Sequence, residues 1–239
     1  LLEAVGNSSI KKFVLTASVG AFFKPDFSNI FTNVTFSHNT WSEIDDINPK
    51  KHEPSFTYLA SKAISDKFVW QAAEKYPNVD FSVVLPPTVY GKFLDHYPHL
   101  AAASELNGNK FIYEIFQKDI KFPSWPVTTI AHNRDVPKVH VACLTAPRLP
   151  KGSEQKKRFI VCCGKMTWVD AINYLREERP GIASRLPDTS LAQPQSQYDL
   201  DTSLTETVLG YKESDYIPWK AMLLEVVDWL LEWEKSMLY

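Results

Sequence analysis

The sequence is short of glycine and cysteine and carries no large excess of either charge. Its 239 residues include 8 glycines and 3 cysteines, and 26 basic against 28 acidic residues give a formal net charge of -2. The densest basic segment is KGSEQKKR at residues 151–158. Because the charges are nearly balanced, we expect no polyanion-binding surface and no nucleic-acid partner.

Long apolar runs are missing too. The most hydrophobic segment, AMLLEVVDWLLEW at residues 221–233, is broken by acidic residues, whereas a membrane span needs about 20 apolar residues. Three cysteines, two of them adjacent, do not make a disulfide framework, and no secretory signal pattern is found near the start. We therefore expect a soluble, cytoplasmic protein without membrane contact.

Metal binding is not expected either. His96 and His99 have a spacing compatible with a metal, but the sequence places no cysteine or third ligand beside them. Exposed loop histidines are the simpler interpretation. His140 is interpreted as a structural histidine on a helix that faces a sheet.

The chain is rich enough in apolar residues for a globular core, with 44% hydrophobic and 13% aromatic residues. An apolar segment at 12–17, a helix through 58–75 and an apolar segment at 79–85 indicate a strand, a crossover helix and a parallel strand. Further elements are expected as helices at 96–106, 135–145, 167–178 and 219–237 and a strand near 157–163. This order predicts the α/β class.

The segment SFTYLASKAISDKFVW contains Tyr58 and Lys62, which are one helical turn apart. A lysine on the same helix face attracts a phenolate by Coulomb interaction, which a tyrosine needs if it is to exchange a proton near neutral pH. The spacing alone is weak evidence, because Tyr216 and Lys220 in YIPWK match it as well. Ser18 strengthens the first pair, since it ends an apolar strand at the edge where open α/β sheets bind ligands.

Four motifs in this order, VLTASVGA, YLASKAISDKFVW, LPPTVYG and RDVPKVHVA, resemble the extended short-chain dehydrogenase/reductase superfamily. The resemblance is greatest to its dihydroflavonol-reductase-like branch, which includes fungal aldehyde and methylglyoxal reductases. The segments RFIVCCGKMTWVDAINYLREERP and YDLDTSLTETVLGYK resemble the C-terminal portion of that branch, so the similarity extends over essentially the whole chain.

The resemblance implies that an aldehyde or ketone is reduced by a nicotinamide cofactor, with NADPH preferred over NAD. The resemblance also implies that Tyr58 is the general acid, that Lys62 holds the nicotinamide ribose and that Ser18 hydrogen-bonds the substrate oxygen. The implied cofactor-binding residues are Tyr58, Lys62, Leu85, Pro86, Pro87, Thr88 and Val89.

The sequence departs from that superfamily by lacking the GxxGxxG turn that holds the cofactor pyrophosphate. We therefore expect a C-terminal part of a longer enzyme, with roughly 100 residues of βαβ units upstream. The expected fold is the C-terminal part of a Rossmann-type doubly wound parallel sheet with a small α/β substrate-binding lobe. Residues 1–90 would belong to the Rossmann domain and 91–239 mostly to the lobe, with segments near 127–145 returning to the core.

An aromatic substrate pocket is a further expectation. The aromatic residues in the loops around the expected site are Phe22, Phe23, Trp41, Phe93, Tyr97 and Trp125. A sugar-nucleotide epimerase or dehydratase with the same serine, tyrosine and lysine is the alternative enzyme, and a non-catalytic scaffold or inactive fragment is the alternative outside enzymes. The expected partner is a small carbonyl substrate, and the expected assembly is a monomer or homodimer.

Overall fold

A computed structural model describes residues 2–44, 54–97, 100–117, 122–123, 125–150 and 153–237. Its central sheet has the order β1-β3-β6, formed by β1 (Lys12–Thr16), β3 (Asp80–Leu85) and β6 (Arg158–Ile160), and both pairings are parallel. Parallel strands joined through helices confirm the predicted α/β class.

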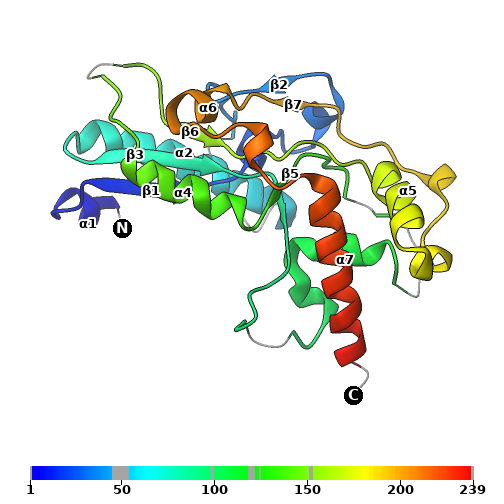
Figure 1. Ribbon diagram of the computed structural model, residues 1–239. Helices are drawn as coiled ribbons and strands as arrows, with labels where there is room; N and C mark the ends of the chain where they lie inside the picture. Colours follow the sequence, from blue (N-terminus) through cyan, green and yellow to red (C-terminus); the bar gives the residue numbers. More distant parts are fainter. Residues whose placement is uncertain are drawn as a thin grey trace.

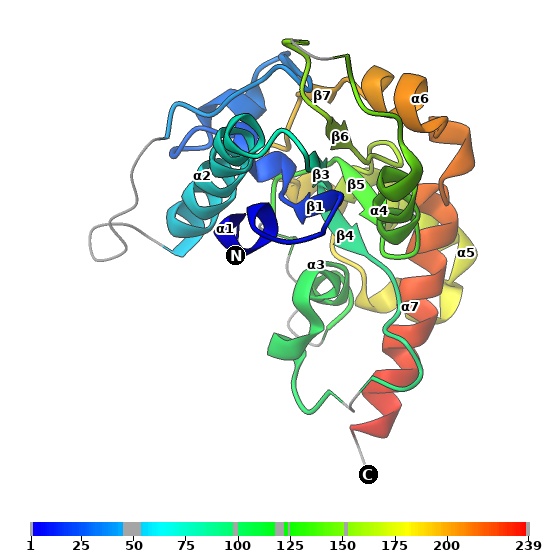
Figure 2. The same ribbon diagram turned by 90° about the vertical axis from the view of Figure 1, so that its left-hand side faces the viewer.

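The central sheet is covered by helices on both faces. All six residues of β3 are buried, as expected for a strand between two neighbours, whereas β1 lies at the sheet edge and is only partly buried. Figure 2 shows α2 (Pro54–Lys75) and α4 (Asp135–Thr145) on opposite sides of β1 and β3. The chain passes from β1 through α2 into β3, which is the predicted crossover unit.

Two smaller parallel sheets extend this core. β4 (Thr88–Tyr90) pairs with β5 (Ile130–His132), and β2 (Thr35–Phe36) pairs with β7 (Asp199–Leu200). The remaining α-helices are α1 (Leu2–Gly6), α3 (Lys110–Glu114), α5 (Trp168–Glu178), α6 (Ser203–Leu209) and α7 (Trp219–Ser236).

The helices α3, α5 and α7 share a second hydrophobic cluster, separate from the cluster between α2 and the central sheet. α7 buries Met222, Leu223, Val226, Leu230 and Trp233 along one stripe, as an amphipathic helix packed on a core does. In Figure 1, α7 runs away from the central sheet, with α5 at its side. The space between the two clusters is where β3 leads into β4.

Within the described residues the predicted helix at residues 96–106 is wrong, and residues 98–99 of that prediction lie outside them. Residues 95–97 form a turn, and a 3₁₀ helix spans Ala103–Asn109 instead. Proline explains part of the failure, because Pro98 has no N–H to donate and disfavours helical backbone in the residue before it.

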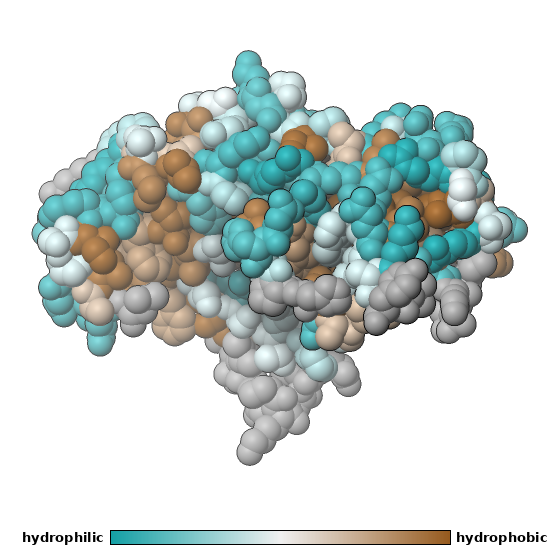
Figure 3. Space-filling view, turned by 60° about the horizontal axis from the view of Figure 1, so that its bottom comes forward, coloured by the Kyte–Doolittle hydropathy of each residue, from teal (hydrophilic) through white to brown (hydrophobic). Residues whose placement is uncertain are grey.

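The surface is mixed in polarity. Hydrophobic residues gather on the left of Figure 3, the end of the molecule where α1 and β1 lie in Figure 1, and they are interspersed with hydrophilic ones. Large exposed apolar side chains include Phe68 on α2 and Val141 and Leu144 on α4. In the part of the chain that the structure describes, no helix combines the length and apolar character needed to cross a membrane.

Candidate active site

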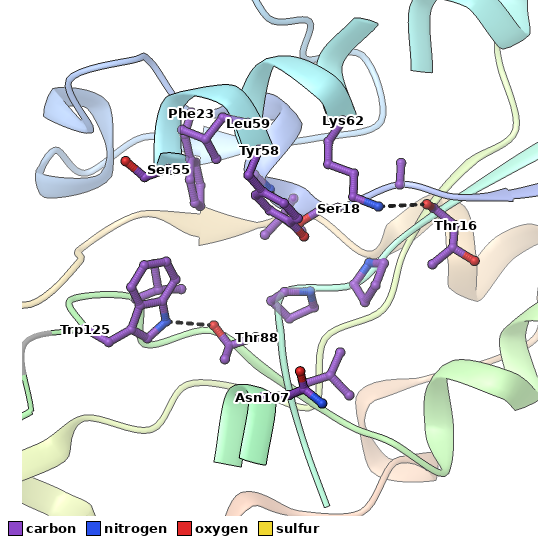
Figure 4. Close-up of a pocket in the computed structure, with 18 of the residues that line it drawn as sticks. Thr16, Ser18, Phe23, Ser55, Tyr58, Leu59, Lys62, Thr88, Asn107 and Trp125 are labelled. Carbon is purple, nitrogen blue, oxygen red and sulfur yellow. Dashed lines mark hydrogen bonds between the residues drawn. The ribbon is translucent and has the colours of Figure 1, made fainter. Parts of the chain in front are cut away.

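Three segments far apart in the sequence meet at the carboxyl end of the central sheet. Ser18 follows β1, Tyr58 and Lys62 lie on α2, and residues 86–89 follow β3. They line a cavity of about 540 Å³, shown in Figure 4. Because parallel strands end at the same edge of a sheet, the side chains after them converge there.

Most of the predicted site residues line this cavity. Ser18, Tyr58, Lys62, Pro86, Pro87, Thr88 and Val89 all contribute to its wall. Leu85 does not, because it is the last residue of β3 and is fully buried in the sheet. The loop after β3 therefore lines the cavity from Pro86 onward.

Ser18 is held by backbone hydrogen bonds on both sides. Ala17 N–H donates to Val84 O at 2.8 Å, and Val19 N–H donates to Pro86 O at 3.1 Å. The Ser18 hydroxyl oxygen accepts from Gly20 N–H at 3.1 Å, as the N-cap of a short 3₁₀ helix. Since this bond uses a lone pair of the hydroxyl, the Ser18 O–H remains available as a donor toward the cavity.

Tyr58 and Lys62 form a pair on one face of α2. The Lys62 Nζ atom lies 5.7 Å from the centroid of the Tyr58 ring and 3.4 Å from the main-chain oxygen of Thr16. Tyr58 is 52% exposed, so its hydroxyl is accessible to a ligand from the cavity. Figure 4 shows the Tyr58 ring beside Ser18 on the same wall.

The second match to the Tyr–Lys spacing does not form a comparable pair. Tyr216 is 5% exposed, and its hydroxyl is buried without a hydrogen-bond partner in the described residues. Lys220 lies over the rings of Tyr174 and Trp219, with its Nζ atom 4.9 Å and 5.7 Å from their centroids. Spacing alone therefore does not distinguish the two matches, whereas their position in the fold does.

Two of the six aromatic residues expected around the substrate line the cavity, namely Phe23 and Trp125. The structure places the other four elsewhere. Phe22 and Trp41 pack against the guanidinium group of Arg158, and Phe93 packs against Tyr97 and against Trp229 on α7. They are loop aromatics with packing partners of their own.

Several lining residues were not predicted from the sequence. The additional ones include Phe27, Ser55, Leu59, Asn107, Gly108 and Val127. The pattern NGN at residues 107–109 did carry a signal, because asparagine and glycine favour left-handed backbone, and Asn107 has φ 51°. No comparable sequence pattern marks Val127, because its place in the cavity wall is set by the tertiary structure.

The histidines that the structure describes have ordinary surroundings. No group of three potential metal-ligating side chains occurs within the described ranges, and His99 lies outside them. His140 on α4 contacts Thr16, with its Nε2 atom 2.7 Å from the Thr16 hydroxyl, and its Nδ1 atom is 2.8 Å from Val136 O. Both ring nitrogens thus have partners, which agrees with the structural interpretation of this residue.

Curated reductases are similar to this chain in sequence, whereas no protein-family profile matches it. Ketoreductase azaE of Aspergillus niger is 27% identical over 206 residues, which cover 84% of this chain and 58% of the relative. Dihydroflavonol 4-reductase of Callistephus chinensis is 24% identical over 231 residues, covering 88% of this chain and 57% of the relative. The chain therefore spans somewhat more than half the length of these two relatives.

Solved structures share the fold. Yeast methylglyoxal/isovaleraldehyde reductase Gre2 complexed with NADPH has a TM-score of 0.76 at 20% identity, covering 98% of this chain and 68% of that chain. UDP-glucuronic acid 4-epimerase from Bacillus cereus in complex with NAD has a TM-score of 0.66 at 14% identity, covering 99% and 65%. The chain is thus a homologue of ketoreductases and dihydroflavonol reductases, and its resemblance to the extended short-chain dehydrogenase/reductases is confirmed.

Proposed function

We propose that this chain carries the carbonyl-reducing site of a nicotinamide-dependent reductase that converts an aldehyde or ketone to an alcohol. The observation that carries the proposal is the meeting of Ser18, Tyr58 and Lys62 on one cavity wall at the carboxyl end of the sheet. The reductase names of the curated relatives support it. Since the chain spans only part of those relatives, the proposed activity is that of the whole enzyme.

Each of the three residues has a distinct task. Tyr58 donates its phenolic proton to the carbonyl oxygen as the carbonyl carbon is reduced. Ser18 donates its O–H to the same oxygen and orients the carbonyl, because its own lone pair is engaged by Gly20 N–H. The Lys62 ammonium group, beside the Tyr58 ring, stabilises the negative charge left on the phenolic oxygen.

The residues present fit the nicotinamide end of a dinucleotide. Within the described residues Lys62 makes one weak hydrogen bond, at 3.4 Å to Thr16 O, and its other N–H groups can bind ribose hydroxyls. Residues 86–89 supply backbone groups along the opposite wall. A bound reduced nicotinamide supplies the hydride for the reduction. We infer NADPH rather than NAD from the reductase branch, although nicotinamide complexes of both kinds occur among the solved structures with this fold.

The two-part division of the chain is also a proposal. Residues 1–90 would form the cofactor side and 91–239 mostly the substrate side, with 127–145 returning to the core. The assignment of residues 127–145 to the core is supported by the pairing of β4 with β5 and by the packing of α4 on the central sheet. A cytoplasmic location and a monomeric or homodimeric state remain predictions.

Turnover by substituted proteins tests the function. We expect NADPH-dependent reduction of small aldehydes and ketones to fall by about 10²- to 10⁴-fold in Tyr58→Phe, which removes the acid and keeps the ring. Ser18→Ala should lower turnover by a similar order, because it removes a donor to the developing oxyanion. Retained turnover in Tyr58→Phe would refute the assignment, and Tyr76→Phe, outside the cavity, is the matched control.

A further inference from the structure

Asn107 adopts a backbone conformation that asparagine rarely takes. Its φ of 51° and ψ of -129° lie in the half of the Ramachandran plot that favours glycine. These angles match the first central position of a type II′ turn, where glycine is the usual residue. A residue that retains this conformation despite its free-energy cost must be held there by its surroundings.

The adjacent residues hold the turn against β4. The Asn109 side chain accepts from Gly91 N–H at 3.1 Å and donates to Gly91 O at 2.8 Å. Gly108 lies so close to the strand that a Cβ atom there would be 2.6 Å from Val89 O. This clamp fixes the turn, and glycine at position 107 would satisfy it without strain.

The side chain of Asn107 lines the same cavity as Tyr58 and Lys62. It is exposed, and within the described residues its carboxamide makes no hydrogen bond. Figure 4 places Asn107 near Thr88, across the cavity from Tyr58 and Lys62. A strained residue thus presents an unused donor and an unused acceptor to the site.

The wall beside Asn107 is flat and apolar. Trp125 stacks on Phe111 at a centroid distance of 5.1 Å and an interplanar angle of 7°, and its Nε1–H donates to Thr88 Oγ1 at 3.0 Å. Since the indole N–H is engaged, Trp125 offers its cavity side mainly as carbon surface. Phe23 and Leu59 line the facing wall.

We propose that Asn107 is a specificity-determining residue that hydrogen-bonds an oxygen substituent of a flat carbonyl substrate. The substrate carbonyl lies at Tyr58, its apolar body packs against Trp125, and a second oxygen, as a hydroxyl or a carbonyl, reaches the Asn107 carboxamide. An amide both donates and accepts, so it pairs with either kind of oxygen. The inference rests on the proposed function and narrows its substrate class.

The test compares binding of two ketones, tetralone and a ring-hydroxylated tetralone, to the full chain by calorimetry. The wild-type protein should prefer the hydroxylated ketone, and Asn107→Gly should reduce that preference about tenfold, the effect of one hydrogen bond to a buried ligand. The same variant should raise the thermal unfolding midpoint, because glycine relieves the strain. Gain of stability together with loss of selectivity distinguishes a ligand-binding role from a merely structural one.

Two further variants sharpen the result. Asn107→Asp keeps an acceptor, so it should retain the preference for the hydroxylated ketone and lose any preference for a ketone with a second carbonyl. Asn39→Gly, in an exposed turn away from the cavity, should leave both preferences unchanged.

Four results would overturn the inference. If the wild-type protein binds neither ketone, both this inference and the proposed function fail. If it binds both ketones equally, or if Asn107→Gly keeps the preference or weakens only NADPH binding, this inference fails and the proposed function stands.

Discussion

Gly108 occupies a position where no side chain fits. A Cβ atom there would lie 2.6 Å from the main-chain oxygen of Val89, which cannot move without disturbing β4. We predict that Gly108→Ala lowers the free energy of unfolding by about 1–3 kcal/mol, the usual cost of overpacking. Urea denaturation measures this directly.

Gly181 provides the matched control for that substitution. A Cβ atom at Gly181 would have nothing within 4 Å. Gly181→Ala should therefore leave the free energy of unfolding unchanged or raise it slightly, since alanine has less freedom in the unfolded chain. Equal destabilisation by both substitutions would show that the contact with Val89 is not the cause.

The three cysteines are buried thiols. Burial raises the pKa of Cys143 and Cys162 to about 11 and that of Cys163 to about 12. A free thiol titrates at about 8.5, so the folded state favours the neutral form, and its stabilising contribution is present below pH of about 8.5. That contribution is lost as the pH rises through the folded values.

We predict slow reaction of all three thiols with a disulfide reagent near neutral pH in the folded protein, because the thiolate is the nucleophile. All three should react rapidly in denaturant. The free energy of unfolding should also fall as the pH rises from about 8.5 toward 11. Rapid labelling of any of the three in the native protein would contradict the burial.

The sequence was sufficient to predict that Ser18, Tyr58 and Lys62 lie together at a site, but not most of the cavity wall. Ser18 and Tyr58 could be found because each stands at a marked place, a strand end and a helix with a lysine one turn away. Val127 and Leu59 could not be found in this way, because the sequence pattern of an apolar residue is the same whether it lies in a core or in a pocket wall. Their role depends on three-dimensional packing.

At the level of elements, one buried ion pair joins β6, α2 and a loop. Arg158 and Asp66 are each 1% exposed, with Nη2 and Oδ2 2.6 Å apart. The Arg158 Nη1 atom also donates to His38 O and Thr40 O, each at 2.6 Å. The guanidinium group thus ties the loop after β2 to the sheet and to the helix that carries Tyr58.

We predict that Arg158→Met destabilises the protein by about 3–5 kcal/mol, because it leaves a buried carboxylate unpaired. The matched control is Arg179→Met, which breaks a pair with Asp228 whose members are 29% and 50% exposed. Its cost should be below about 1 kcal/mol. Denaturant unfolding of both variants measures the difference, and comparable losses would contradict the structural role of the buried pair.

Elements with a strong pattern were predictable, and elements without one were not. The apolar run of β3 and the stripe of α7 reflect burial directly, and Thr167 caps α5, accepting from Asp170 N–H at 3.0 Å. The segment 96–106 lacks such a stripe, and the high helix propensity of its alanines does not compensate for that. Local propensity fails there because the loop is shaped by the contact of residues 107–109 with β4.

At the scale of the whole molecule, the proposed function places only one end of a dinucleotide on this chain. In that proposal Lys62 and residues 86–89 hold the nicotinamide riboside, whereas the given sequence contains no GxxGxxG turn for the pyrophosphate. We predict that this chain binds NADPH and reduced nicotinamide mononucleotide with affinities within about tenfold of each other, since the adenylate half adds little binding energy. Calorimetry with both compounds tests this, and nanomolar affinity confined to NADPH would contradict it.

Isotope transfer tests the central claim most directly. The protein is incubated with millimolar reduced nicotinamide cofactor, deuterated at the transferable position, and a flat aryl ketone, and the alcohol is analysed by mass spectrometry. The account predicts deuterium on the carbinol carbon with the wild-type protein and at least about 100-fold less labelled alcohol with Tyr58→Phe. Unlabelled alcohol from the wild-type protein, or equal labelling by both proteins, would contradict it.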